Sequence, residues 1–411
     1  MVSKLNRYLV WILCLVALSF LAAIKIVPLI DYHNSDFFTF WLSGRLVAQG
    51  EDPYLAKTWL QGHHKYGATW IPNQTFIYPL PLSFIFIPIA FLPLYHAFVL
   101  WMVLSQFMIV LAVALLLKSY PEHLQKIFIL PLIIGTAIFR PALLTLHNGQ
   151  LTALLLFVLA LTVYFWEQGK WWQGCILLPI LALKPNLGVP MIILFAFYLL
   201  LRRQGKALLV VAASGLVLLL AGLVQDPHWV VEFWGAGNTK LSQMFGYSPT
   251  VWGLSAFLCG YNRVCTVGWG ALAVFLLVLG YVILLGRGHQ HLSPALIVSF
   301  VICIVLLITP YTWSYDQLLL LLPIVIITMG LATRGYRFLP VVLIFITIDI
   351  LAFILLGINA RVGKDLWYVI LPISILTLLL LYLLTDKPAY QAVKVQQLMQ
   401  TPEILDQSHK S

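Results

Sequence analysis

The stretch Asp36–Tyr54, DFFTFWLSGRLVAQGEDPY, opens the longest polar interruption in the first half of a chain that is otherwise strongly apolar. It follows the apolar run Tyr8–Ile30, which is long enough to cross a membrane. Hydrophobic residues make up 62% of the 411 residues and charged residues only 9%. Repeated apolar runs of this length predict an all-α polytopic membrane protein. We expect about 12 transmembrane helices and a large first extracytoplasmic loop, residues 31–76.

The stretch itself has the pattern of one helix. Asn34, Ser35 and Asp36 are all good helix-starting residues, and Gly50 with Asp52-Pro53 would end the helix. Helical spacing places Asp36, Thr39 and Ser43 on one polar side. The opposite side is an apolar stripe that we expect on the membrane surface: Phe37, Trp41, Gly44 and Ala48. Asp36 is therefore either a helix N-cap or an acid that does chemistry at the outer end of the first span.

The charge pattern indicates an orientation in the membrane. The net charge of +10 does not indicate nucleic acid, because the basic residues are scattered between apolar runs. Lys4 and Arg7 precede the first span, so the N-terminus is predicted to be cytoplasmic and the loop with Asp36 outside. Residues 1–385 read as one membrane domain, and the polar tail 386–411 as cytoplasmic.

The pattern D-x-x-x-F-W-x-x-G-R-x-x-x-x-G-x-D-P-Y, from Asp36 to Tyr54, resembles glycosyltransferase family 87. Members of that family are polyprenyl-phosphate-sugar-dependent enzymes of the GT-C membrane superfamily. The resemblance implies a GT-C type bundle with Asp36 as the catalytic base. It also places Arg45 and Tyr54 near the substrate, although Arg45 lies about half a helical turn out of phase with Asp36. Asp31 lacks this pattern and is the weaker candidate.

Shorter motifs follow in the order of the same family. They are Tyr78 in a Y-x-P entry, Gly149-Gln150, Lys184-Pro185, and Pro310 with Trp313 in a P-x-x-W. After Trp313 the family commonly has histidines, whereas this chain has Tyr315-Asp316-Gln317, so any histidine-dependent role would pass to Tyr315 or Asp316. The resemblance implies substrate-binding roles for six residues: Tyr78, Gln150, Lys184, Trp313, Tyr315 and Asp316.

Lys184 is also notable without the family, because a lysine inside an apolar run is expensive unless it is paired or functional. One interpretation gives it the phosphate of a lipid-linked donor as partner. The other is a lysine that reaches from a short helix to the outer surface.

The implied reaction moves a hexose or pentose from a polyprenyl-phosphate donor to a lipid or glycan acceptor. It would invert the anomeric centre, on the extracytoplasmic face of a bacterial cytoplasmic membrane. A nucleotide-sugar donor is not expected, because the chain has no Gly-rich phosphate loop and no D-x-D motif. No cofactor is expected, and the adjacent histidines His63 and His64 would point apart on a helix, which argues against a metal. A transporter or flippase of lipid-linked saccharides, or a scaffold, remains the alternative.

Four further expectations concern organisation. A second span runs from Tyr78 to Pro93, and the part from Ile127 to His147 forms a broken pair of short helices hinged at Arg140-Pro141. Gln225–Thr250 forms a second outer loop. Asp349, in the middle of an apolar run, either faces the bundle or pairs with a buried cation such as Arg140. Cys259 and Cys265 lie in an outer segment, where they either form a disulfide or remain two thiols.

Overall fold

The computed structural model of the chain describes residues 16–71, 73–244, 246–288, 292–362 and 365–384. The expectations for Lys4 and Arg7, for residues 8–15 of the Tyr8–Ile30 run and for the tail 386–411 fall outside these residues. Within the described ranges every regular element is a helix and no strand occurs. This confirms the all-α membrane class, since helices satisfy their own backbone hydrogen bonds inside a bilayer.

Six helices in the described ranges have the length and composition of a membrane crossing. They are α5 (Leu94–Leu117), α11 (Gly205–Gln225), α14 (Arg263–Gly288), η4 with α16 (Ser314–Leu320 and Leu321–Thr333), α17 (Phe338–Val362), and η5 with α18 (Leu366–Val369 and Ile370–Leu384). A seventh is the pair α6 (Glu122–Ile138) and α7 (Arg140–Asn148), bent by 55°. The break is at Phe139, beside the predicted hinge, because Phe139 is extended and Pro141 has no N–H.

Six apolar helices are shorter, with 10–17 residues. They are Val16–Leu29, α4 (Pro81–Ala90), α8 (Thr152–Glu167), α9 with η3 (Trp171–Cys175 and Leu178–Leu183), α10 (Pro185–Leu201) and α15 (Pro294–Ile308). Prolines set several of these limits, since Pro81, Pro185 and Pro294 each stand at the start of a helix. The helices of full crossing length therefore do not by themselves reach the predicted number of about 12.

The helices differ in how much of their surface the protein covers. α15 is buried along almost its whole length, and so is α16. A helix that is apolar all round belongs inside a bundle, and these two form its centre. In α11 and α14, by contrast, only 11% of the spanning window is buried. Their exposed leucines and valines form the kind of surface that faces lipid.

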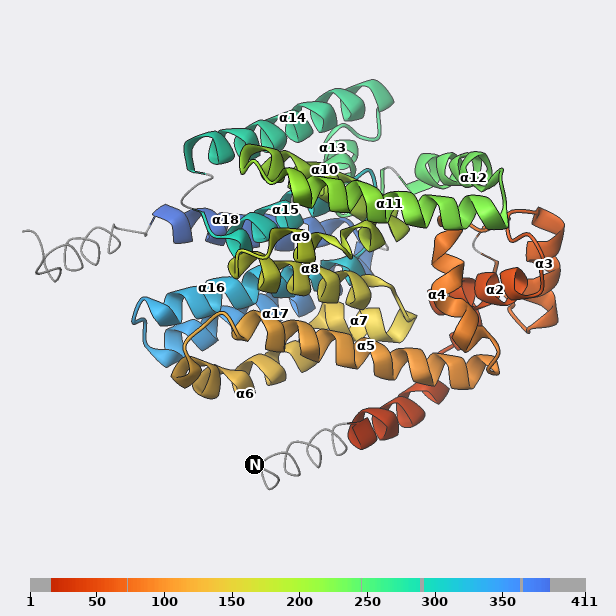
Figure 1. Cartoon of the computed structure of the whole chain (residues 1–411), viewed down its shortest axis with the longest axis horizontal. Coiled ribbons are helices and arrows are strands. Elements are labelled where there is room, and N and C mark those ends of the chain that lie inside the picture. The colour runs from red at the N-terminus through yellow and green to blue at the C-terminus, as the bar shows by residue number, and fades with distance from the viewer. Residues whose placement is uncertain (1–15, 72, 245, 289–291, 363–364, 385–411) are drawn as a thin grey trace, which may run out of the picture.

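One end of the bundle carries a group of short elements (right in Figure 1). α2 (Asp36–Ala48), α3 (Ala56–Lys65), α4 and α12 (Trp229–Met244) gather there. α2 and α4 touch where a Cβ on Gly44 would lie 2.9 Å from the backbone carbon of Phe86, so this contact requires glycine. The second span predicted from Tyr78 to Pro93 is not formed at full length, because α4 has only 10 residues and lies against α2.

One other expectation needs correction at this end. Phe37 and Trp41, expected on the membrane surface, are buried within the protein. Phe37 stacks on Phe98 with 4.9 Å between ring centres, and Trp41 Nε1 donates to the Leu92 carbonyl at 3.2 Å. The predicted outer loop Gln225–Thr250 contains the helix α12. The apolar stripe is buried because the outer segments fold onto one another rather than lying separately on the membrane.

A disulfide joins Cys259 to Cys265 between α13 (Val251–Leu258) and the start of α14, so the alternative of two free thiols is not realised. Their Cα atoms are 5.8 Å apart, inside the usual range for a bridge. The free cysteines Cys175 and Cys303 are buried, as expected for packing residues.

Candidate functional site

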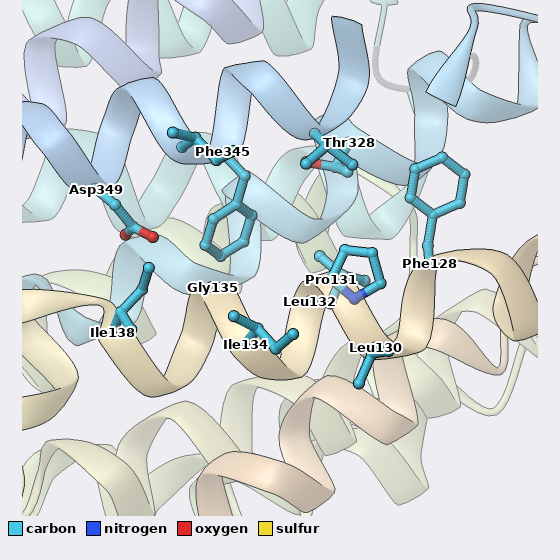
Figure 2. Close-up of a pocket in the computed structure, with 12 residues that line it drawn as sticks. Phe128, Leu130, Pro131, Leu132, Ile134, Gly135, Ile138, Thr328, Phe345 and Asp349 are labelled. Carbon is cyan, nitrogen blue, oxygen red and sulfur yellow. The ribbon is translucent and has the colours of Figure 1, made fainter. Parts of the chain in front are cut away.

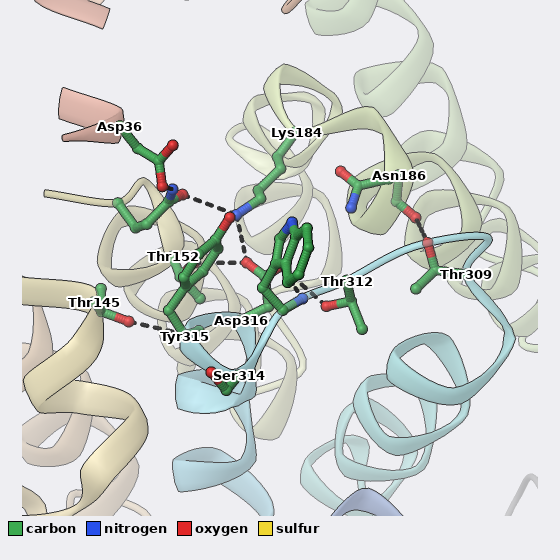
Figure 3. A network of polar contacts seen from close by, with 12 residues as sticks. Asp36, Thr145, Thr152, Lys184, Asn186, Thr309, Thr312, Ser314, Tyr315 and Asp316 are labelled. Atoms are coloured by element: carbon green, nitrogen blue, oxygen red, sulfur yellow. Dashed lines mark hydrogen bonds and ion pairs between the residues drawn. The ribbon is translucent and has the colours of Figure 1, made fainter. Parts of the chain in front are cut away.

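A cavity of about 290 Å³ lies where the short outer elements meet the end of the bundle. Its lining comes from α2, from the segment after α3, from the start of α10, from the end of α12, from the segment that joins α15 to η4, and from η4 itself. The lining residues are Asp36, Thr39, Trp70, Asn73, Ile77, Tyr78, Lys184, Asn186, Met244, Tyr311, Trp313, Tyr315 and Asp316. Figure 3 shows the polar network on one side of this cavity.

Asp36 is the first residue of α2, and Ser35 before it is the N-cap, so Asp36 is not the cap. The Asp36 Oδ2 atom accepts a hydrogen bond of 2.5 Å from Nε2 of Gln150 (Figure 3). The first turn of a helix presents unpaired N–H groups and a positive dipole end. The start of α2 therefore favours a negative charge on the one carboxylate that it presents to the cavity.

Gln150 is placed by the glycine before it. Gly149 ends α7 with φ of +62°, and Gln150 N then donates to the Thr145 carbonyl at 3.0 Å, as in a Schellman cap. A Cβ on Gly149 would collide with the rings of Phe37 and Phe98. Glycine thus serves both the turn and the close approach of α2, and the fully buried Gln150 side chain reaches Asp36.

Lys184 stands at the break between η3 and α10, where Pro185 begins the new helix. It is 3% exposed. Its ammonium forms an ion pair with Asp316 and donates to Gln150 Oε1 at 3.0 Å. The Nζ atom also lies 4.8 Å from the centre of the Tyr315 ring. An ammonium has three N–H donors, and these three partners are enough to use them all.

Asp316 is fully buried in η4 and receives four donors on its two oxygens. Thr152 Oγ1 and Lys184 donate to Oδ1, while Thr312 Oγ1 and the Trp313 backbone N–H donate to Oδ2. The three bonds other than that from Lys184 measure 3.0–3.1 Å. A buried charge is tolerated when it is paired and hydrogen-bonded in this way.

The four side chains form one continuous line: Asp36, Gln150, Lys184 and Asp316. The Lys184–Asp316 pair is neutral as a unit, so Asp36 carries the net charge of the line. Because Gln150 accepts from Lys184, its amide NH₂ must turn toward Asp36. A carboxylate held in a fixed orientation at an open cavity is suited to take a proton from a hydroxyl group.

The other predicted residues fall into two groups. Tyr78, Trp313 and Tyr315 line the cavity. Tyr54 does not line it; its hydroxyl donates to the Tyr78 carbonyl at 2.6 Å and so supports the wall from behind. Arg45 points away from Asp36, as its helical phase requires.

The contacts of Arg45 are made within the protein, away from the cavity lining, and give no support to the substrate-binding role predicted for it. Its Nη1 donates to the Ala90 carbonyl at 2.7 Å and its Nε to the Tyr66 hydroxyl at 3.1 Å. The guanidinium also lies over the Trp41 and Tyr66 rings. Arg45 thus ties the end of α2 to the end of α4.

Sequence reasoning missed several polar groups of the site. Thr152 and Thr312 hold Asp316, and Asn186 donates its Nδ2 to the Tyr311 carbonyl at 2.9 Å. Asn186 could have been predicted from the sequence, because it stands two residues after Lys184 at the start of a helix. Threonines in apolar helices give no such signal, since most of them bond to their own helix.

Two other groups of charged residues lie outside this cavity. Asp52, Asp226 and Glu232 have carboxylate oxygens within 4.8 Å of one another. Burial raises the pKa of Glu232 most, the neighbouring Asp226 and Asp52 raise it further, and the resulting pKa is about 7. The predicted pair of Asp349 with Arg140 is not formed, because the Arg140 guanidinium lies 5.4 Å from the centre of the Tyr368 ring instead.

Comparison with known proteins gives one match. The family model described as Glycosyltransferase family 87 matches residues 76–310, more than half of the chain. Tyr78, Gln150 and Lys184 lie inside the matched region, whereas Asp36 and Asp316 lie on either side of it. No curated protein and no solved structure matches the chain.

Proposed function

Because this chain belongs to glycosyltransferase family 87 and is a membrane glycosyltransferase, we propose that it transfers a sugar from a polyprenyl-phosphate donor to a hydroxyl group. The donor sugar is a hexose or pentose, and the acceptor is a lipid or glycan. The reaction takes place in the cavity at the Asp36 end of the bundle. The observation that carries this proposal is the line of contacts from Asp36 through Gln150 and Lys184 to Asp316 beside that cavity.

Asp36 acts as the general base. It accepts the proton of the acceptor hydroxyl as the oxygen attacks the anomeric carbon of the donor. The bond from that carbon to the phosphate oxygen breaks, and polyprenyl phosphate leaves with the bonding electrons. One direct displacement of this kind inverts the anomeric centre. A retaining route needs a second carboxylate as nucleophile, and Asp316 is unsuited because both its oxygens are already bonded.

Lys184 organises the base in this scheme. To bind the donor phosphate, as the sequence suggests, its ammonium would have to give up Asp316, Gln150 or the Tyr315 ring. The present contacts favour a different role, in which the Lys184–Asp316 pair fixes the amide of Gln150 and Gln150 orients Asp36. The aromatic lining suits the sugar, since Trp70, Tyr78 and Trp313 offer ring faces for stacking.

Helix directions support twelve crossings and an extracytoplasmic site. If α4 stays at the cavity end and does not cross, the six long helices, the bent pair α6–α7 and the other five short apolar helices each cross once. This gives twelve crossings. Basic residues then occupy the turns at the far end of the bundle: Lys118, Lys170, Arg202, Arg203, Lys206, Arg334 and Arg337. By the positive-inside rule that end is cytoplasmic. The cavity then faces the outside of a bacterial cytoplasmic membrane, where a lipid-linked donor is presented.

The test is transfer in reconstituted vesicles with labelled polyprenyl-phosphate sugars. Asp36→Asn keeps the hydrogen bond to Gln150 sterically possible but removes the base, so we expect the turnover rate to fall ~10²-fold or more. Asp31→Asn is the matched control, because Asp31 lies in the same outer segment but is absent from the cavity lining. It should leave turnover within about threefold.

Near wild-type transfer by the Asp36→Asn protein would remove Asp36 from the mechanism. A wild-type protein that moves the labelled lipid across the membrane without transferring its sugar would support the transporter interpretation instead. Retention of the anomeric configuration in the product would contradict the single displacement.

A further inference from the structure

Asp349 lies near the middle of the membrane-length helix α17 and is 3% exposed. Neither oxygen of its carboxyl group has a hydrogen-bond partner among the described residues. Buried polar groups are nearly always paired, and an acid at this depth in a membrane helix normally faces a partner or a functional cavity. The unpaired carboxyl of Asp349 therefore needs an explanation that the protein's own side chains do not provide.

The carboxyl group points into a second cavity, of about 320 Å³, between α6 and α17 (Figure 2). Apart from Asp349 and Thr328, its lining is apolar and includes Phe128, Pro131 and Phe345. Asp349 and Thr328 lie toward opposite ends of the view, with Phe345 between them.

The cavity is open to the lipid side of the bundle. Leu130 is 63% exposed and Ile134 53% exposed, although both contribute to the lining. Both belong to α6, which packs on α17 at the outside of the bundle. A molecule dissolved in the membrane can enter between these helices without passing through water.

We propose that this cavity binds an alcohol with a long apolar chain, which enters from the lipid and donates its hydroxyl hydrogen to Asp349. The apolar walls match the chain, and the unpaired carboxyl oxygens match one donor. A phosphate or sugar headgroup does not fit, because the lining contains no basic residue and only one other polar side chain. A cation would match the charge, but removing its hydration to reach this depth costs far more than removing that of one hydroxyl group.

This site is independent of the proposed glycosyl transfer. The two cavities share no lining residue, and the experiment below reads binding rather than turnover. Its failure would leave the assignment of Asp36 untouched, and loss of transfer in an Asp36 variant would leave this site untouched.

The experiment measures thermal unfolding of the full chain in nanodiscs of one phosphatidylcholine. We expect 1-dodecanol to raise the unfolding midpoint by ~2 °C or more, since a ligand bound only to the folded state stabilises it. Dodecyl methyl ether has the same chain without a donor and should produce less than half of that shift. Equal shifts from the alcohol and the ether would overturn the proposal, and so would a larger shift from dodecylamine.

Three variants locate the effect. Asp349→Leu should abolish the difference between alcohol and ether, and Asp349→Asn, which keeps an acceptor oxygen in the same shape, should retain part of it. Thr328→Val, at the other end of the cavity, is the control and should keep the full difference. A full alcohol effect in Asp349→Leu would overturn the proposal. If Asp349→Leu does not fold, the proposal is tested on the other two proteins. The difference between the alcohol and the ether should then be full in the wild type and partial in Asp349→Asn, and equal differences in both would overturn the proposal.

Discussion

The three contacts of the Lys184 ammonium determine what its replacement should do. Lys184→Met leaves Asp316 as a buried charge without its cation, which typically costs about 3–5 kcal/mol of unfolding free energy. It also frees the Gln150 amide to rotate, so Asp36 loses its orientation. We expect the turnover rate to fall ~10-fold or more while the donor KM changes less than about threefold. Both constants are measured by transfer assays in vesicles.

The double variant Lys184→Met with Asp316→Leu separates stability from positioning. Replacing both members of a buried pair by apolar residues is often neutral, so most of the lost stability should return. Turnover should stay low, because nothing then fixes Gln150. A large rise in donor KM with unchanged turnover in Lys184→Met would instead show that Lys184 binds the donor phosphate, as first predicted from sequence.

At this scale the sequence indicated which residues are unusual but not how they pair. Lys184 and Gln150 stand out because charged and amide groups are costly in apolar runs. Asp316 stands out because the segment Tyr315-Asp316-Gln317 stands where the related family commonly has histidines. No sequence rule states that Gln150 lies between Asp36 and Lys184, since these residues come from three elements more than 30 residues apart. The contacts of Lys184 that support the proposed positioning role therefore come only from the structure.

At the scale of elements, Glu232 links α12 to the segment after α2. Burial, followed by Asp226 and Asp52, raises the pKa of Glu232 to about 7, from 4.5 for an ordinary glutamate. The folded protein therefore holds this proton more tightly than the unfolded chain does. Its contribution to stability is complete below pH 4.5 and is lost as the pH rises through 7.

We expect the thermal unfolding midpoint of the wild-type protein to fall between pH 5 and pH 8, and Glu232→Gln to reduce that fall. Glutamine cannot ionise, so the repulsion from Asp226 and Asp52 disappears. Glu51→Gln is the matched control, because Glu51 is an exposed acid beside Asp52. An identical pH slope in wild-type and Glu232→Gln proteins would show that this cluster does not titrate as described.

The outer elements were also the least predictable part of the fold. The run from Tyr78 to Pro93 is apolar enough for a span, and its composition alone gives no reason to stop. Pro81 begins α4 and Pro93 precedes α5, so the helix between them is short, and Gly44 lets α2 lie against that helix. The helices of full crossing length were easier to predict, because sustained apolar length is the strongest signal a sequence carries.

At the scale of the whole molecule, one short helix decides the direction of every later crossing. If α4 crossed the membrane, α5 would run outward. The bent pair α6–α7 would then have to enter the membrane from outside and leave it on the same side, as a re-entrant loop. With α4 held at the cavity end, α5 runs inward and α6–α7 makes one bent crossing (Figure 1). The second arrangement places the basic turns at Lys118, at Lys170, from Arg202 to Lys206 and from Arg334 to Arg337 on one side, in accord with the positive-inside rule, whereas Arg263 lies on the other side.

This orientation can be read by thiol labelling of intact cells with a membrane-impermeant reagent. In a background where Cys14, Cys175 and Cys303 are replaced by alanine, we introduce Glu51→Cys, Phe91→Cys or Lys118→Cys, all at exposed positions. Positions 51 and 91 flank α4, so both should label from outside, and position 118 only after the cells are opened. Labelling of position 91 only in opened cells would show that α4 crosses. The native Cys259–Cys265 pair provides an internal check, because a disulfide persists in an oxidising compartment. It should label from outside only after reduction, and labelling that requires opened cells would reverse the proposed orientation of the cavity.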